Sequence, residues 1–162
     1  MLDAMPHGDV KPRAFNGLRA PPVVQSIRRA TLDDMPHMIE MAKKLWARYP
    51  ERQVVQGEGW MRWCISNPER LVLLGSTSIG VASVSWNYGY ERRARMDILA
   101  GLPVPGTALQ TLRMLHIMIA WAREQGAQGT FRLSADTEAD FGPFARRLGG
   151  KAVTTTRYEI PL

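Results

Sequence analysis

The sequence predicts an α/β domain in which helices cover both faces of a central mixed sheet. Residues 96–100 have the composition of a strand and are followed by a Pro/Gly turn and a long amphipathic helix, residues 107–125. A second strand, residues 130–135, follows that helix, so the two strands are expected to run parallel through a right-handed crossover. Another amphipathic helix, residues 35–49, has one apolar face that must also pack on a sheet.

The elements before residue 96 follow from local patterns. Residues 23–30 predict a strand, and Thr31 and Asp34 have the spacing of a capping box at the start of the 35–49 helix. That helix should end at Tyr49, because the residue before a proline disfavours the α region. Its apolar stripe consists of Met35, Met38, Ile39, Ala42, Leu45, Trp46 and Tyr49.

Residues 53–65 predict a second helix with Trp60 and Trp63 on one side. These indoles either pack in the core or contact a substrate. Residues 71–74 and 79–86 predict a hairpin, since both runs are rich in β-branched residues and the connection is short.

The C-terminal part predicts a helix over residues 141–148, a glycine turn and a final strand over residues 152–160. Gly126 is the expected left-handed stop of the preceding 107–125 helix. The residues of that long helix expected to be buried are Leu109, Leu112, Leu115 and Ile119.

Length and composition predict one compact domain with an N-terminal arm. A chain of 162 residues, 45% of them hydrophobic, can bury one core, which we assign to residues 25–162. Residues 1–24 contain prolines, glycines and cations without an apolar period, and so form an extended basic arm. The arm either straps its own domain or docks on a partner protein.

The net charge of +6 favours an acidic partner such as CoA phosphates or nucleic acid, although a basic surface without a partner is an equal alternative. Aromatic and cationic residues alternate over residues 86–95, where they could stack bases and contact phosphates or form a solvated hairpin tip.

No run is long enough to span a membrane, and residues 1–7 lack the basic start and apolar run of a secretory signal. Cys64, the single cysteine, is expected in the core; it excludes an internal disulfide and predicts a reducing compartment, hence a cytoplasmic protein. The three histidines show no ligand spacing, so no metal site is predicted.

The order and spacing of these elements resemble the GCN5-related N-acetyltransferase (GNAT) fold. Residues 26–35 are similar to that family's first strand and helix entry, and residues 146–150 to its late helix and turn. The resemblance covers residues 25–162 and implies a partly splayed sheet that binds acyl-CoA, with acetyl-CoA as the cofactor and a primary amine as the acceptor.

The turn before the long helix is the expected pyrophosphate site, because a helix N-terminus presents unpaired amides and a favourable dipole to an anion. We assign the cofactor to Leu99, Gly106, Thr107, Ala108 and Leu109. The family carries Arg or Gln at the start of this loop, where the chain has Pro103, and Pro105 has no N–H to donate. Ala145 stands where many members carry a tyrosine general acid, and its neighbour Phe144 has no proton to give.

Asp97 is the one acid on the strand that leads to this turn, and the resemblance implies a general base there, often Glu. A structural aspartate paired with Arg95 or Arg113 is the competing account. Two functions remain open at this point: an acyl-CoA-dependent N-acyltransferase, or a catalytically degenerate GNAT-fold binding or assembly protein. The basic arm suits the second function, for example in a phage particle, which would place the protein within a virus particle rather than free in the cytoplasm.

Overall fold

The computed structural model describes residues 26–47, 55–87, 91–133 and 142–153. The arm over residues 1–24, the end of the first helix at Tyr49 and the strand expected to reach residue 160 lie wholly or mostly outside these ranges. The elements are β1 (Arg28–Arg29), the 3-10 helix η1 (Leu32–Asp34), α1 (Met35–Trp46), α2 (Val55–Ser66), β2 (Arg70–Leu74), β3 (Ser78–Asn87), β4 (Glu91–Gly101), α3 (Thr107–Glu124), β5 (Phe131–Arg132) and α4 (Gly142–Arg147).

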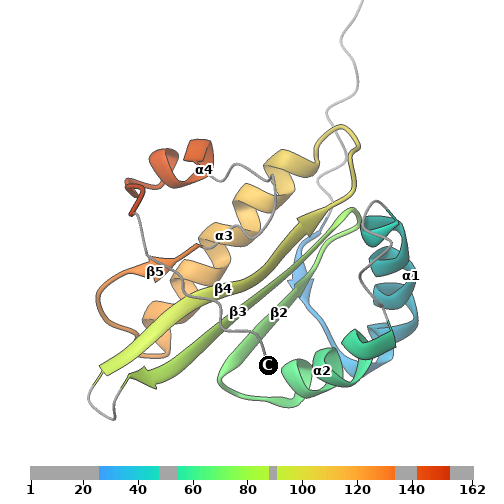
Figure 1. The fold of residues 1–162 in the computed structure, drawn as a ribbon, viewed down its shortest axis with the longest axis horizontal. Helices are drawn as coiled ribbons and strands as arrows, with labels where there is room; N and C mark the ends of the chain where they lie inside the picture. The colour runs from blue at the N-terminus through green and yellow to red at the C-terminus, as the bar shows by residue number, and fades with distance from the viewer. Residues whose placement is uncertain (1–25, 48–54, 88–90, 134–141, 154–162) are drawn as a thin grey trace, which may run out of the picture.

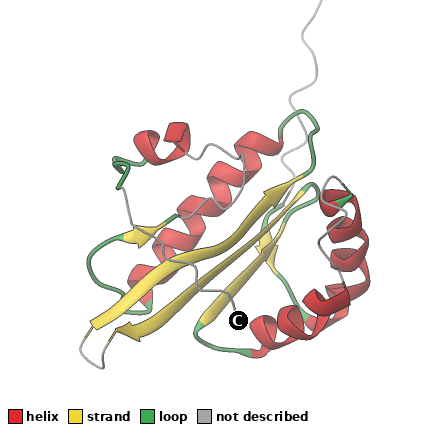
Figure 2. Ribbon diagram, viewed as in Figure 1, coloured by secondary structure: helices red, strands yellow, loops and turns green. Residues whose placement is uncertain are grey.

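The five described strands form one mixed sheet in the order β1-β2-β3-β4-β5. Successive strands from β1 to β4 pair antiparallel, and β4 pairs with β5 in parallel. The long strands β3 and β4 form the middle of the sheet, as Figure 2 shows. The predicted parallel arrangement around the long helix is therefore confirmed.

Helices lie on both faces of the sheet, as the sequence predicts (Figure 1). Alternate residues of β2 show the two faces: Leu71 and Leu73 pack on the side of α3, whereas Val72 and Leu74 pack on the side of α1 and α2. We call these the α3 face and the α1/α2 face. α3 buries one stripe on the first face, and α1 and α2 bury theirs on the second, so two apolar cores sandwich the sheet.

The pairing between β4 and β5 is short. Within the described residues it joins Ala94 to Phe131 and Arg95 to Arg132, so Met96 to Gly101 of β4 continue beyond it while still paired to β3. The sequence placed the parallel contact on residues 96–100, and the structure places it two residues earlier. The edge of β4 that faces away from β3 is thus left without a described strand over its second half.

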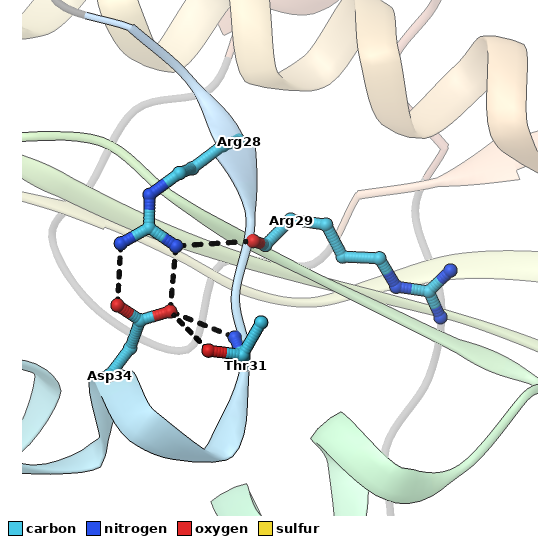
Figure 3. Close-up of polar contacts among 4 residues, drawn as sticks. All are labelled: Arg28, Arg29, Thr31 and Asp34. Atoms are coloured by element: carbon cyan, nitrogen blue, oxygen red, sulfur yellow. Dashed lines mark hydrogen bonds and ion pairs between the residues drawn. The ribbon is translucent and has the colours of Figure 1, made fainter.

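The predicted capping box is present where β1 leads into α1 (Figure 3). The carboxylate of Asp34 accepts hydrogen bonds from the backbone N–H of Thr31 at 2.8 Å and from its hydroxyl at 3.1 Å. Arg28 donates to both carboxylate oxygens. These bonds hold the pKa of Asp34 well below its usual range, the hydrogen bonds from Arg28 being the largest cause.

One prediction about α3 is wrong. Leu112 and Leu115 are buried and Ile119 is half-buried, but 49% of Leu109 is exposed. The buried stripe instead begins at the polar residues Thr107, Gln110 and Thr111. Leu109 lies on the outer side of the first turn, because it is about 200° around the helix axis from Thr107.

The left-handed backbone expected at Gly126 is observed, with φ of 73°, directly after α3. No helix in the described ranges is both long and apolar enough to cross a lipid bilayer.

Candidate active site

A bulge in β4 positions Asp97. Val81 and Ala82 are neighbours on β3, but their partners on β4 are Ile98 and Met96, so Asp97 is the extra residue. Met96 packs on the α3 face and Ile98 on the α1/α2 face. Asp97 also turns to the α1/α2 face, where it meets Arg70. A bulge re-aims side chains in this way and is frequent beside functional sites.

Both carboxylate oxygens of Asp97 are engaged by arginines. Oδ2 accepts from Nη1 of Arg70 at 2.6 Å, and Oδ1 accepts from Nε of Arg95 at 2.8 Å. Only 10% of the Asp97 side chain is exposed. The sequence suggested Arg95 and Arg113 as partners of Asp97. Arg95 forms an ion pair with it, whereas Arg113 is exposed on α3. The geometry thus supports Asp97 as a structural aspartate in an ion pair. To act as a general base, Asp97 would have to give up one of these two hydrogen bonds.

Two indoles and a thiol surround Arg70. Its guanidinium carbon lies 4.3 Å from the centre of the Trp63 ring and 5.7 Å from that of Trp60. Trp60 packs on the α1/α2 core, whereas 50% of Trp63 is exposed, so packing explains the first indole better than the second. Cys64 is fully buried in the same core, as predicted, and burial raises the pKa of its thiol.

The start of α3 presents backbone amides to solvent. Gly106 precedes the helix with φ of 89°, and a Cβ at this residue would meet nothing within 4 Å. Gly106, Ala108 and Leu109 are exposed, and a helix cannot satisfy the N–H groups of its own first turn. Thr107 differs from its neighbours: its N–H donates to the carbonyl of Val104 at 3.3 Å, and its side chain is buried.

Gln110, a buried residue that was not predicted from the sequence, fixes this turn. Its Oε1 accepts from the N–H of Thr77 at 3.2 Å and from the Thr77 hydroxyl at 2.9 Å, and also from the hydroxyl of Ser78. Thr107 donates to Thr77 as well, at 3.0 Å. The network ties the β2–β3 turn to the first turn of α3. The available signal was a polar residue in the buried stripe of an amphipathic helix.

An apolar pocket lies between α1, α2 and the sheet, beside the bulge. Glu58 is the one charged residue among those that line it. Ile98 and Ala100 of β4 contribute to its wall, so the pocket begins next to Asp97. The other lining residues are Met35, Met38, Ile39, Ala42, Leu45, Trp46, Gly57, Trp60, Met61 and Ile79.

Leu99 and Ala145 are two further residues that the sequence singled out. The side chain of Leu99 packs against the α3-face core, so any contact with a cofactor would come from its backbone on the open edge of β4. Ala145 lies in α4, and its carbonyl accepts from the N–H of Gly150 at 2.7 Å. All four tyrosines of the chain lie outside the described residues.

No protein-family model matches this sequence, and no curated protein matches it significantly. Solved structures do. A transcriptional regulator from Bacillus halodurans C-125 superposes with a TM-score of 0.69 at 15% identity, over 84% of this chain and 99% of that one. The aminoglycoside 6'-N-acetyltransferase AAC(6')-Ig from Acinetobacter haemolyticus gives 0.67 at 16% identity, over 85% and 98%. A GCN5-related N-acetyltransferase from Ralstonia eutropha JMP134 gives 0.64 at 14%, over 84% and 98%.

These similarities cover nearly the full length of each solved structure. The chain therefore has the GNAT fold, as the order of its elements predicts. Identities at this level establish the fold alone, and the activity has to be argued from the residues of the site.

Proposed function

We propose that the protein is an acyl-CoA-dependent N-acyltransferase that acts on a primary amine. One observation carries the proposal: in a GNAT fold, the exposed amides at the start of α3 lie just after the open edge of β4. The amides of Gly106, Ala108 and Leu109 would hold the pyrophosphate of acetyl-CoA, aided by the helix dipole. The open space at Gly106 leaves room for a phosphate.

Fewer backbone N–H groups are free to bind the pyrophosphate than the five residues assigned to the cofactor would suggest. Thr107 already donates its N–H to Val104, and Pro105 has none to give. The site therefore fits a pyrophosphate through three backbone donors. When bound, acetyl-CoA would supply the activated acyl group as a thioester.

The acceptor side would be the α1/α2 face. The pocket beside the bulge would take the body of the acceptor, with its amine near Asp97. Asp97 remains the proposed base: it would take the ammonium proton after exchanging its bond to Arg95, the more exposed of its two arginines. Arg70 would continue to hold the other carboxylate oxygen.

Acetyl-CoA binding is best measured by calorimetry with the full chain. Micromolar binding is expected, and Gly106→Asp should abolish it by placing bulk and negative charge against phosphate. Gly126→Asp is the matched control, because it puts the same residue at the same kind of left-handed glycine, at the other end of α3. Wild-type affinity in a folded Gly106→Asp protein would move the cofactor site elsewhere.

Asp97→Asn tests the chemistry separately. A base predicts a loss of turnover of about a hundredfold or more with unchanged acetyl-CoA affinity. A purely structural aspartate predicts a lower unfolding free energy, because Arg70 loses its buried partner, with turnover of the folded fraction unchanged.

A second function stays open for specific reasons. Pro103 and Pro105 have no backbone N–H to donate to a pyrophosphate. Both carboxylate oxygens of Asp97 already accept hydrogen bonds from arginines. These features favour a GNAT-fold protein that binds or assembles without catalysis, for example in a phage particle. Absence of any heat signal with millimolar acetyl-CoA would favour this alternative.

A further inference from the structure

Four directly paired residues form one row across the sheet, and three of them are arginines. Arg70 of β2 pairs with Ser83 of β3, Ser83 pairs with Arg95 of β4, and Arg95 pairs with Arg132 of β5. Directly paired residues point to the same face, which is here the α1/α2 face that also carries Asp97.

Arg95 and Arg132 are direct neighbours of like charge. Both are exposed, with 62% of the Arg95 side chain accessible, and paired strands lie only about 5 Å apart. Like charges directly opposite each other on adjacent strands are destabilising. An anion bound between them would relieve this repulsion.

The nearest acid on this face is insufficient. Asp97 shares its one negative charge between Arg70 and Arg95, so the row keeps an excess of positive charge. The Nε of Arg95 donates to Asp97 and, at 3.4 Å, to the hydroxyl of Ser83. The two terminal nitrogens of Arg95 have no partner among the described residues. Glu91, further along β4, pairs with Arg93 instead.

We propose that Arg95 and Arg132 form an anion subsite that binds the carboxylate or phosphate of the acceptor. The inference rests on the proposed function and names its substrate class: a small primary amine that carries an acidic group. Guanidinium groups suit this task, since their planar fork matches such oxyanions. Because Arg95 also donates to Asp97, an anion held there lies beside the proposed base.

The geometry favours a small ligand over a nucleic acid. Asp97 and Glu91 interrupt the arginines along β4, so a phosphate backbone would not meet a continuous row of free cations there. A single acidic group needs only the short gap between Arg95 and Arg132.

The test follows the arginine Nε–Hε signals of the isotope-labelled full chain by NMR, in low salt and without CoA. The probes are phosphoethanolamine and β-alanine, with ethanolamine as the matched amine that lacks an acid. The two acidic probes should shift the Arg95 signal, and ethanolamine should not. Arg95→Gln and Arg132→Gln should each weaken phosphoethanolamine binding about tenfold or more, because each removes a charge-assisted partner. Arg123→Gln, which removes an exposed charge in the last turn of α3, should leave it unchanged.

Equal binding of ethanolamine, or unaltered affinity in both row variants, would overturn the subsite. Binding of a single-stranded oligonucleotide at Arg95 without binding of the acidic amines would overturn it as well. Because the probes need no cofactor, the outcomes separate: acidic amines that bind to a protein unable to bind acetyl-CoA would refute the acyltransferase and retain the anion subsite. The reverse result would retain the enzyme and refute the subsite.

Discussion

At the scale of single residues, two buried or half-buried polar side chains support the structure in different ways. Gln110 joins two secondary-structure elements through one amide oxygen, and Asp34 joins a helix start to a cation. Loss of the Gln110 acceptor would leave the buried Ser78 hydroxyl unsatisfied, which costs more than the bond itself contributes. The partners of Asp34, Arg28 and Thr31, are exposed and can bond to water instead.

Gln110→Leu should lower the free energy of unfolding by about 1–3 kcal/mol, because Thr77 and the fully buried Ser78 lose their shared acceptor. Urea denaturation with an unchanged m-value would measure the loss. Gln128→Leu, at an exposed residue, is the control and should change stability by less than about 0.5 kcal/mol. Equal stability of the two variants would show that the network does not support the fold.

Asp34→Asn should cost about 1 kcal/mol at neutral pH through the weakened helix cap. The pKa of Asp34 is lowered in the folded protein, so its contribution is present above the unfolded value of about 3.9 and is lost as the pH falls below it. The stability difference between wild type and variant should therefore shrink from pH 6 to pH 3. A difference that stays constant over this range would show that the charge of Asp34 contributes nothing.

At the scale of elements, the contact between β4 and α3 sets where the helix begins. A Cβ on Gly101 would lie 2.2 Å from Cγ2 of Thr107, closer than any side chain tolerates. Only glycine lets the end of β4 approach the first turn of α3 this closely. The proposed pyrophosphate amides, those of Gly106, Ala108 and Leu109, all lie within two residues of Thr107.

Gly101→Ala should destabilise the protein by about 1–3 kcal/mol through overpacking, and should also weaken acetyl-CoA binding by shifting the first turn of α3. Thr107→Ser removes the clashing methyl and keeps the hydroxyl that donates to Thr77. The double variant should regain most of the lost stability in a double-mutant cycle of unfolding free energies. Additive losses in the cycle would show that the two residues do not clash.

The elements could be predicted from sequence because their signals are local. The stripe of α1, the capping box at Thr31 and the glycine after α3 each depend on residues within a few positions of one another. The bulge at Asp97 left no such signal, since it depends on the register of β3. The partnership of Asp97 with Arg70 could not be predicted either, because 27 residues separate them and only strand pairing brings them together.

The exposure of Leu109 has a related cause. Its apolar character suggested burial, but α3 turns its polar residues Thr107 and Gln110 toward the sheet to bind the β2–β3 turn. A stripe that mixes polar and apolar residues cannot be oriented by hydrophobicity alone. The turn and the strand of the candidate site could thus be predicted from the sequence. The row of arginines could not, because it depends on how the strands pair in the sheet.

At the scale of the whole molecule, the sheet is assembled mainly from neighbouring strands. β2, β3 and β4 pair as successive antiparallel strands, whereas helices separate β1 from β2 and β4 from β5. All four described pairs still join strands that are consecutive in the chain, so the order of elements determines most of the topology. The fold could be predicted from sequence for this reason. Residues 1–24, which are expected to form an arm, contain no comparable pattern.

The arm should owe any order to contact with another surface. Fixing its residues costs about 1–2 kcal/mol each, and without regular apolar spacing it cannot recover this by forming a core. We predict that Phe15 and Leu18 bury against that surface, while Arg13 and Arg19 pair with carboxylates or phosphate. Deletion of residues 1–22 should leave a folded domain with an unchanged melting temperature that no longer associates, as measured by light scattering with a thermal melt. An unfolded product would instead identify the arm as a strap of its own domain, and unchanged association would exclude it from assembly.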